Sequence, residues 1–212
     1  MDTYPIENLF YFADGVERAH EEGLNRFLGG LSASINWVDT RLNPLFQVAN
    51  FRDVISVRAI DAFKRIDQPI FLEEEGVVIR KLGGFPGTLT DFVIGIIGLS
   101  GIDCLVEGMA SNDFRCQVIS FSAYMDESLR HPELFWSVLN GTWRMRVPIN
   151  RRGKDDSLWH HIVLAGFHET VATMINVGRQ QFETELAAVG RPHHLLQLRR
   201  WLIETGRVSE KK

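Results

Sequence analysis

Apolar residues recur at helical spacing between residues 51 and 66, where positions three and four apart fall on one face of a helix. The residues of this apolar stripe are Ile55, Ala59, Ala62, Phe63 and Ile66. Two earlier stretches, residues 6–13 and 32–39, show the apolar runs and the alternation that are typical of strands. A short turn and a helix over residues 16–28 are expected between them. The first third of the chain is therefore predicted to alternate strands with helices.

The middle of the chain carries mostly strand patterns. We expect strands over residues 70–72, 77–80, 115–125, 134–140 and 142–148. The last two flank Asn140-Gly141, and an Asn-Gly pair between apolar runs is the strongest short-range signal for a hairpin turn. These two strands are therefore predicted to pair in antiparallel fashion.

Helical patterns separate and follow these strands. After a turn at Pro86-Gly87, a helical region reaches about Met109 and is interrupted near Gly98-Gly101. Further helices are expected over residues 179–189 and 193–205. This order predicts the α/β class, with a mixed central β-sheet flanked by helices and a cleft at the loops near the strand ends. We expect a single domain over residues 1–205 and a flexible tail over residues 206–212.

Composition narrows the classes of function. The 212 residues are 45% hydrophobic and 24% charged, which suits one sizeable domain with a core. The formal net charge of -4 disfavours direct DNA or RNA binding, although a local basic pocket for a small anion stays open. Two cysteines are too few for a disulfide framework, no signal-peptide pattern is visible, and the apolar run 92–99 is too short to span a bilayer. We expect a cytoplasmic protein without membrane contact.

Four stretches, in order, resemble motifs of the inosine triphosphate pyrophosphatase (ITPase) family, which acts on noncanonical purine nucleoside triphosphates. The most specific is QPIFLEEEGVVIRKLGGFPGTLTDF (residues 68–92), similar to the pattern P-x-x-A-D-D-S-G-L-x-V-x-x-L-x-G-x-P-G-x-Y-S-A-R. The residues in register are Pro69, Gly76, Leu82, Gly84, Pro86 and Gly87. LFYFADGVERAHE, FHETVATM and RPHHLLQLRRWL resemble the opening strand-turn-helix, the G-x-x-K-T-x-A-E-M motif and the S-H-R-x-x-A-L-x-x-L motif. The resemblance implies an ITPase-like fold with a nucleotide-binding cleft.

The resemblance also implies a metal site on the acidic row Glu73–Glu75. Glu73 and Glu74 occupy the positions of the family's paired aspartates, which hold Mg²⁺ for the triphosphate, since hard cations take oxygen ligands. Glu74 is the expected catalytic residue if the chain is an active enzyme. The alternative is that the acidic row forms an ordinary solvated turn.

The positions that the resemblance assigns to the phosphates depart from the family pattern. The Thr-Gly-Asn turn becomes Ala13-Asp14-Gly15, so Asp14 and Gly15 would replace its phosphate contacts. Two helix lysines become Arg18 and Arg58, which can still hold phosphate oxygens, although each also suits an ordinary surface position. The stretch LFQVANF (residues 45–51) lacks an expected glutamate ligand. Binding of Mg²⁺ is therefore expected to be weak or absent if the site is degenerate.

Three residues are candidates for contact with the purine base. Trp159 most nearly matches the family's stacking aromatic, although it also suits a core position. His193 matches the histidine of the S-H-R motif, and His194 replaces its arginine. A donor to the 6-oxo group would favour hypoxanthine over adenine. Zinc binding by the paired histidines is disfavoured, because no cysteine or acid completes a ligand set.

Three classes of function remain open: an active Mg²⁺-dependent pyrophosphatase of (d)ITP and XTP, a catalytically impaired sensor subunit that binds the nucleotide, and a structural partner protein. The Thr-Gly-Asn turn and one glutamate ligand of the family pattern are missing from this chain. Their loss favours the sensor, because an active site tolerates the loss of few catalytic residues. Such a chain resembles the ITPase-like subunit of Kongming-type anti-phage systems, which implies control of an effector such as a Sir2-like NADase. The apolar segment 92–109 also predicts a homodimer or a complex with that effector.

Overall fold

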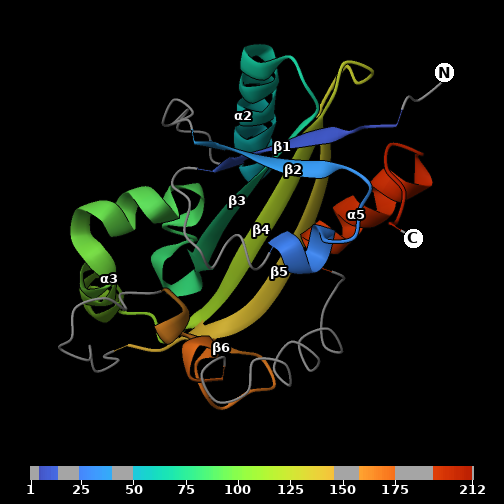
Figure 1. Ribbon diagram of the computed structural model, residues 1–212. Coiled ribbons are helices and arrows are strands. Elements are labelled where there is room, and N and C mark those ends of the chain that lie inside the picture. The colour runs from blue at the N-terminus through green and yellow to red at the C-terminus, as the bar shows by residue number, and fades with distance from the viewer. Residues whose placement is uncertain (1–4, 14–23, 40–49, 146–157, 175–192, 212) are drawn as a thin grey trace. The chain divides into compact units, whose positions relative to one another are not determined.

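Figure 1 shows the computed structural model, which describes residues 5–13, 24–39, 50–145, 158–174 and 193–211. Its strands are β1 (Asn8–Ala13), β2 (Ser34–Asp39), β3 (Ile70–Ile79), β4 (Arg115–Met125), β5 (Glu133–Trp143) and β6 (Ile162–Leu164). Its helices are α2 (Phe51–Ile66), α3 (Thr90–Gly108) and α5 (His194–Glu204), with short 3₁₀ turns at Arg80–Leu82, Gly87–Leu89 and Leu158–His160. The predicted helices over 16–28 and 179–189 lie wholly or mostly outside the described residues.

The strands form one six-stranded sheet in the order β2-β1-β3-β4-β5-β6. Strand β1 pairs in parallel with both β2 and β3, whereas β5 and β6 are antiparallel. A mixed sheet with flanking helices confirms the predicted α/β class. The parallel pairs place the carboxyl ends of β1 and β2 at the same edge, with Ala13 opposite Asp39.

The chain divides into two compact units. Unit 1 comprises residues 1–74, 120–137 and 192–212, and unit 2 comprises residues 75–119 and 138–191. Each unit has its own hydrophobic cluster. The buried cluster of unit 1 includes Tyr11, Phe71, Tyr124, Phe135 and Leu198. The buried cluster of unit 2 includes Val77, Ile102, Val118, Trp143 and Ile162.

Helix α2 has the bounds that its apolar periodicity predicts. Asn50 caps its start by accepting a hydrogen bond from the backbone N–H of Arg52 at 3.0 Å. Asp67 ends it in the left-handed conformation, with φ of 52°. Three residues of the apolar stripe, Ile55, Ala59 and Ala62, are fully buried, and Phe63 and Ile66 are half-buried. The buried side of the helix therefore packs against the rest of unit 1.

The predicted hairpin at Asn140-Gly141 is wrong. Strand β5 runs through both residues without a turn, and Gly141 pairs with Leu164 of β6. A Cβ atom on Gly141 would lie 2.7 Å from the backbone oxygen of Val163. The glycine is required by the close approach of the neighbouring strand and not by a turn. The strands predicted over 70–72 and 77–80 are likewise one continuous strand, β3.

Helix α3 is broken where its glycines predict, with Gly98 at φ 65° and ψ 176°. The segment Gly87–Gly108, with a mean hydropathy of 1.9, is long and apolar enough to cross a membrane by length and composition alone. Val93, Leu99 and Ile102 of this helix belong instead to the buried cluster of unit 2. Only 28% of its most apolar window is buried, and Phe92 and Ile96 are exposed, so the helix buries one apolar face and leaves another open.

The sequence predicts a flexible tail over residues 206–212, whereas the structure anchors residues 206–211 within unit 1. Arg207 is 6% exposed and donates through Nε to Asp126 at 2.8 Å. Val208 is buried, and Glu210 forms a β-bridge with Leu31. A buried ion pair and a backbone bridge thus hold a segment that its charge alone marks as a tail.

Candidate functional site

The two predicted metal ligands, Glu73 and Glu74, lie in the middle of β3. Successive side chains of a strand leave opposite faces of the sheet. Their partners follow this rule, since Glu73 contacts His194 of α5, whereas Glu74 pairs with Arg58 of α2. These two helices flank the sheet in Figure 1. The structure therefore does not bring the two carboxylates together.

Glu73 is the centre of a hydrogen-bonded cluster within unit 1. Its Oε1 atom lies 2.5 Å from Nε2 of His194, and its Oε2 atom accepts from the hydroxyl of Tyr11 at 3.2 Å. On the far side of the ring, Nδ1 of His194 lies 3.0 Å from Oγ of Ser137. The Glu73 side chain is 17% exposed and that of His194 is 5% exposed. Both ring nitrogens of His194, a predicted nucleotide contact, are thus used inside the protein.

Tyr11 acts as a donor in this cluster. Burial, together with the charge of Glu73, raises the pKa of the Tyr11 hydroxyl well above its ordinary value. The phenol therefore stays protonated and donates a hydrogen bond to the carboxylate of Glu73. The sequence did not identify Tyr11 as a site residue, because a tyrosine in an apolar strand is usually a core residue. Its proximity to Glu73 follows from the strand register, in which Tyr11 lies opposite Phe71, two residues before Glu73.

His193 lies in a stack of three rings. It packs against Phe27, with ring centroids 4.2 Å apart, and against His194, with centroids 4.1 Å apart. Its Nδ1 atom accepts from the backbone N–H of Leu195 at 3.3 Å, so His193 caps the start of α5. Burial first, and the neighbouring His194 second, lower the pKa of His193 to about 3. His193 is therefore a neutral ring at physiological pH, with its proton on Nε2.

Arg58, a predicted phosphate contact, forms an ion pair with Glu74 through its Nη1 atom. The side chains are 25% and 15% exposed, so the pair is half-buried between α2 and β3. The guanidinium offsets the cost of burying the carboxylate. Arg58 and Glu74, which the sequence predicts to bind the same triphosphate, are thus neighbours in unit 1.

The predicted metal site has few candidate ligands. Among the residues that the structure describes, no group of three or more His, Cys, Asp and Glu side chains is arranged to hold a metal ion. Mg²⁺ commonly takes one or two protein carboxylates and completes its octahedron with water and phosphate oxygens. Glu74 alone suits that arrangement once it leaves Arg58, whereas Glu73 is engaged by two donors.

The GGFPG segment forms a tight corner in unit 2. Gly83 and Gly84 adopt φ of 66° and 99°, conformations that favour glycine. The hydroxyl of Thr90 donates to the backbone oxygen of Gly87 at 2.7 Å and accepts from the N–H of Val77 at 2.8 Å. This corner therefore fixes the end of β3 to the start of α3. The role of Thr90, in the position of the family's serine, was missed in the sequence.

The remaining predicted site residues stay predictions. Asp14, Gly15 and Arg18 lie outside the described residues. Trp159 is half-buried and packs against the buried cluster of unit 2, which agrees with the core alternative and leaves part of its surface open.

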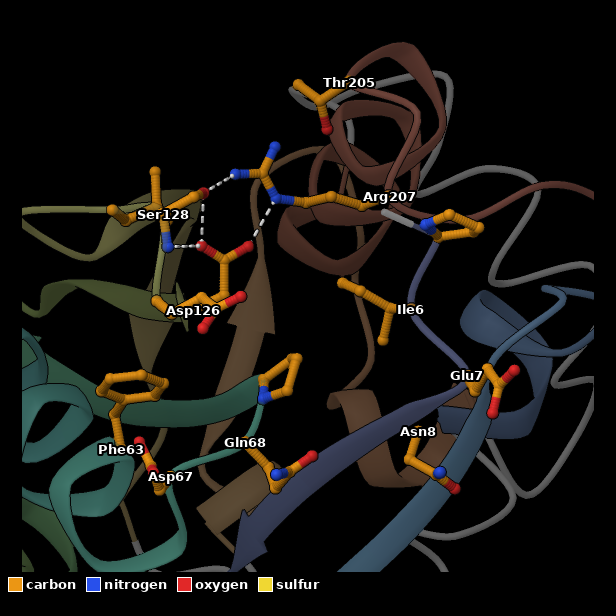
Figure 2. A pocket seen from close by; sticks show the side chains of 14 residues that line it. Ile6, Glu7, Asn8, Phe63, Asp67, Gln68, Asp126, Ser128, Thr205 and Arg207 are labelled. Carbon is orange, nitrogen blue, oxygen red and sulfur yellow. Dashed lines mark hydrogen bonds and ion pairs between the residues drawn. The ribbon is translucent and has the colours of Figure 1, made fainter. Parts of the chain in front are cut away.

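A cavity of about 780 Å³ lies elsewhere in unit 1, around the anchored tail. Figure 2 shows Asp126 bonded to Ser128 and Arg207 on its wall, with Phe63 and Ile6 also lining it. No predicted site residue lines this cavity. This cavity is therefore separate from the hydrogen-bonded cluster around Glu73.

Comparisons with known proteins place the chain in a family. The profile of the Ham1 family matches residues 32–189. A dITP/XTP pyrophosphatase from Thermococcus kodakarensis is 31% identical over 86 residues, which are 41% of this chain and 46% of that protein. One from Hyperthermus butylicus is 34% identical over 61 residues, which are 29% of this chain and 32% of that protein. The chain thus matches less than half the length of these two relatives.

Solved structures share the fold. A HAM1 protein from Coxiella burnetii has a TM-score of 0.70 at 18% identity, covering 94% of this chain and all of the other. A nucleoside-triphosphatase, or dITP/XTP pyrophosphatase, from Mycobacterium abscessus has a TM-score of 0.64 at 15% identity, covering 85% of this chain and 96% of the other. The Ham1 profile and the dITP/XTP pyrophosphatases among the relatives confirm, at the level of the family, the resemblance that the sequence motifs carry. This chain belongs to the Ham1 family.

Proposed function

We propose that this chain binds a noncanonical purine nucleoside triphosphate of the dITP/XTP class and hydrolyses it poorly or not at all. Family membership supports the ligand class, because the relatives described above are dITP/XTP pyrophosphatases. The observation that carries the loss of turnover is the pairing of both acids, Glu74 with Arg58 and Glu73 with His194. A carboxylate that is paired with a protein group is less able to hold a metal or to take a proton from water.

The phosphate end of the ligand is assigned to Arg58. Its guanidinium is partly exposed, and a guanidinium holds phosphate oxygens through two parallel hydrogen bonds. A triphosphate would compete with Glu74 for this group. Glu74, once released, would hold Mg²⁺, which supplies neutralisation of the phosphate charge when bound.

The sequence motif, and no ligand contact in the structure, assigns the base end to His193, which lies on the α5 side of β3, whereas Arg58 lies on the α2 side. The Nδ1 atom of His193 is used by the backbone of Leu195, so the neutral ring offers an N–H donor at Nε2. A 6-oxo purine accepts such a hydrogen bond, whereas the 6-amino group of adenine would leave the donor unpaired. Trp159, which belongs to unit 2, stays a prediction from the sequence alone.

A protein that binds a nucleotide without consuming it is suited to signalling its presence. We extend the proposal to a sensor that controls a partner effector, such as a Sir2-like NADase, in antiviral defence. Control requires that the nucleotide favour one conformation of the complex over another. The exposed apolar residues of α3, Phe92, Ile96 and Ile97, are the proposed contact for a second copy or for that effector.

Hydrolysis of dITP or XTP to the monophosphate and pyrophosphate is the second candidate, and the names of the relatives favour it. Both acids of β3 are retained as glutamates, one methylene longer than aspartate. The ion pair between Arg58 and Glu74 would have to open on nucleotide binding for Glu74 to act as the base.

Isothermal titration calorimetry with dITP, XTP and dATP tests the binding proposal. We expect dITP and XTP to bind more tightly than dATP, in the presence and in the absence of Mg²⁺. Equal affinity for all three nucleotides would contradict the assigned base site. Absence of binding would leave only a structural role for the chain.

A further inference from the structure

The cavity of about 780 Å³ in unit 1 has the size of a small-molecule site, and the proposed nucleotide binding does not use it. Asn8, Pro69 and Asp126 line it, so it lies where β1 and β3 begin and β4 ends. Because β1 and β3 are parallel, this edge of the sheet is opposite to the carboxyl end of β1. The cavity is therefore a candidate for a second, separate ligand site.

One wall of the cavity is a fixed guanidinium group. Nε of Arg207 donates to Asp126 at 2.8 Å, and Nη2 donates to the hydroxyl of Ser128 at 2.9 Å. The guanidinium carbon also lies 4.4 Å from the centroid of the Trp201 ring. Arg207 is only 6% exposed. Two charge-assisted or polar hydrogen bonds and an aromatic face thus hold this planar group in one orientation.

The third nitrogen of this guanidinium, Nη1, is left over. Among the residues that the structure describes, Nη1 has no hydrogen-bond partner. Figure 2 shows it directed toward Thr205, which also lines the cavity, without a dashed bond. A donor on a largely buried side chain gains free energy when an acceptor pairs with it. The cavity therefore offers a fixed position for an oxygen acceptor of a ligand.

The rim of the cavity is acidic. Glu7, Asp67 and Glu127 come from three separate segments, line the cavity and are exposed. Arg207 is the one cation among the lining residues that the structure describes, and Asp126 already offsets its charge. The local excess of negative charge attracts a cation, although each exposed carboxylate contributes little by itself. The rim thus favours a ligand with a positively charged end.

This cation is organic and not a metal ion. In the part of the chain that the structure describes, no three His, Cys, Asp or Glu side chains are arranged to hold a metal. Between the acidic rim and Arg207, the wall includes the apolar side chains of Ile6, Phe63 and Leu129. Such surface suits the hydrocarbon stem of a ligand whose charged groups stay solvated. The wall therefore fits an acceptor, an aliphatic stem and a cation joined in one molecule.

We propose that this cavity binds a basic amino acid of the arginine and lysine class, either free or as the carboxyl-terminal residue of a peptide. Its carboxylate accepts from Nη1 of Arg207, and its cationic groups face Glu7, Asp67 and Glu127. The cavity has room for more than one residue, so both sources fit. The site is independent of the proposed nucleotide site, because the two share no residue.

The first test uses analogues that each lack one group of the ligand. Calorimetry at low salt compares L-arginine with agmatine, which has no carboxylate, and with L-citrulline, which has no side-chain charge. We expect both analogues to bind about tenfold more weakly than L-arginine. Glycyl-glycyl-L-arginine separates the two sources: tighter binding than L-arginine assigns the peptide, and weaker binding assigns the free amino acid. Equal binding of agmatine, or no binding of L-arginine and the tripeptide at millimolar concentration, would overturn the proposal.

The second test changes the rim and leaves the buried network intact. We expect Glu7→Gln and Glu127→Gln each to weaken L-arginine binding about threefold, and the double variant about tenfold. Asp61→Asn is the control, because Asp61 is an exposed acid of α2 that does not line the cavity. The control should retain the wild-type affinity, and dITP should not displace L-arginine. Unchanged affinity in the double variant, or displacement by dITP, would overturn the assignment to this cavity.

Discussion

The carboxylates of Glu73 and Glu74, neighbours in the sequence, face different helices: Glu73 bonds to His194 of α5, and Glu74 pairs with Arg58 of α2. A straight strand sends consecutive side chains to opposite faces of its sheet, so one ion cannot take both without a change in the backbone. The two carboxylates that the resemblance predicts to share a metal ion are thereby divided between two local environments.

The ion pair on the α2 side should contribute to folding as well as to binding. Glu74→Gln leaves the Arg58 guanidinium half-buried without its charged partner, and we expect a loss of about 1–3 kcal/mol in the free energy of unfolding. Urea unfolding of both single variants and of the double variant Glu74→Gln/Arg58→Met measures the coupling. Additive single effects would show that the pair contributes nothing to stability.

Arg58 should also contribute to the affinity for the triphosphate. Arg58→Ala is expected to weaken dITP binding by about 1.5–3 kcal/mol, the value of a charge-assisted hydrogen bond. The matched control is Arg65→Ala, because Arg65 lies on the same helix and pairs with Asp61 on its exposed face. Equal calorimetric affinities for both variants and the wild type would return Arg58 to an ordinary surface role.

The anchored C-terminal segment should make stability sensitive to acid. Burial raises the pKa of Asp126, but hydrogen bonds from Arg207, Ser128 and Tyr124 outweigh it and leave the pKa below its ordinary value. A carboxylate with a depressed folded-state pKa stabilises the protein above its unfolded-state pKa. That contribution is lost as the pH falls through the folded-state pKa, below about pH 4.

Asp126→Asn should therefore lower the melting temperature at pH 7 and flatten its fall at acidic pH. Thermal unfolding followed by circular dichroism at a series of pH values measures both effects. An unchanged melting temperature at pH 7 would mean that the ion pair with Arg207 does not anchor the segment.

Much of the fold could be predicted from the sequence because local patterns and tertiary structure agree. The apolar stripe of α2, the alternation of β2 and the glycine break in α3 each lie where the sequence places them. The hairpin prediction at Asn140-Gly141 was wrong because the sequence does not distinguish a glycine that allows close approach of a neighbouring strand from a glycine that forms a turn. That distinction depends on Val163 of β6, which a local pattern does not contain.

The candidate site could be predicted only in its components. The motifs identify Glu73, Glu74, Arg58 and the two histidines as a set, but the partner of each depends on which face of the sheet it occupies. Ser137 carries no signal in the sequence, because a serine in a buried strand has many ordinary roles. The hydrogen bonds between His194 and its partners Glu73 and Ser137 are therefore visible only in the structure.

The close approach at Gly141 gives a test of the corrected strand. Gly141→Ala would place a methyl group 2.7 Å from the Val163 oxygen, and we expect a loss of about 1–3 kcal/mol in the free energy of unfolding. Gly95→Ala in α3 is the control, because its Cβ meets nothing within 4 Å and alanine favours a helix. A neutral Gly141→Ala variant in urea unfolding would favour the hairpin instead.

The exposed apolar face of α3 should govern association. Phe92 is 50% exposed and Ile96 is 65% exposed, and we expect the double change Phe92→Asp/Ile96→Asp to yield a monomer where the wild-type protein is a dimer or larger. Multi-angle light scattering measures the mass of each. A wild-type protein that is monomeric, alone and with its candidate effector, would remove this surface from the proposal.

The central claim is that the site binds dITP but hydrolyses it poorly, because Glu74 is held by Arg58 and Glu73 by His194. The most direct measurement follows pyrophosphate release and bound nucleotide in the same sample, with purified protein, dITP and Mg²⁺. The account predicts a full stoichiometric signal for bound dITP, almost no pyrophosphate, and the same traces for Glu74→Gln. Brisk release of pyrophosphate by the wild-type protein, abolished in Glu74→Gln, would contradict the account and establish an active pyrophosphatase.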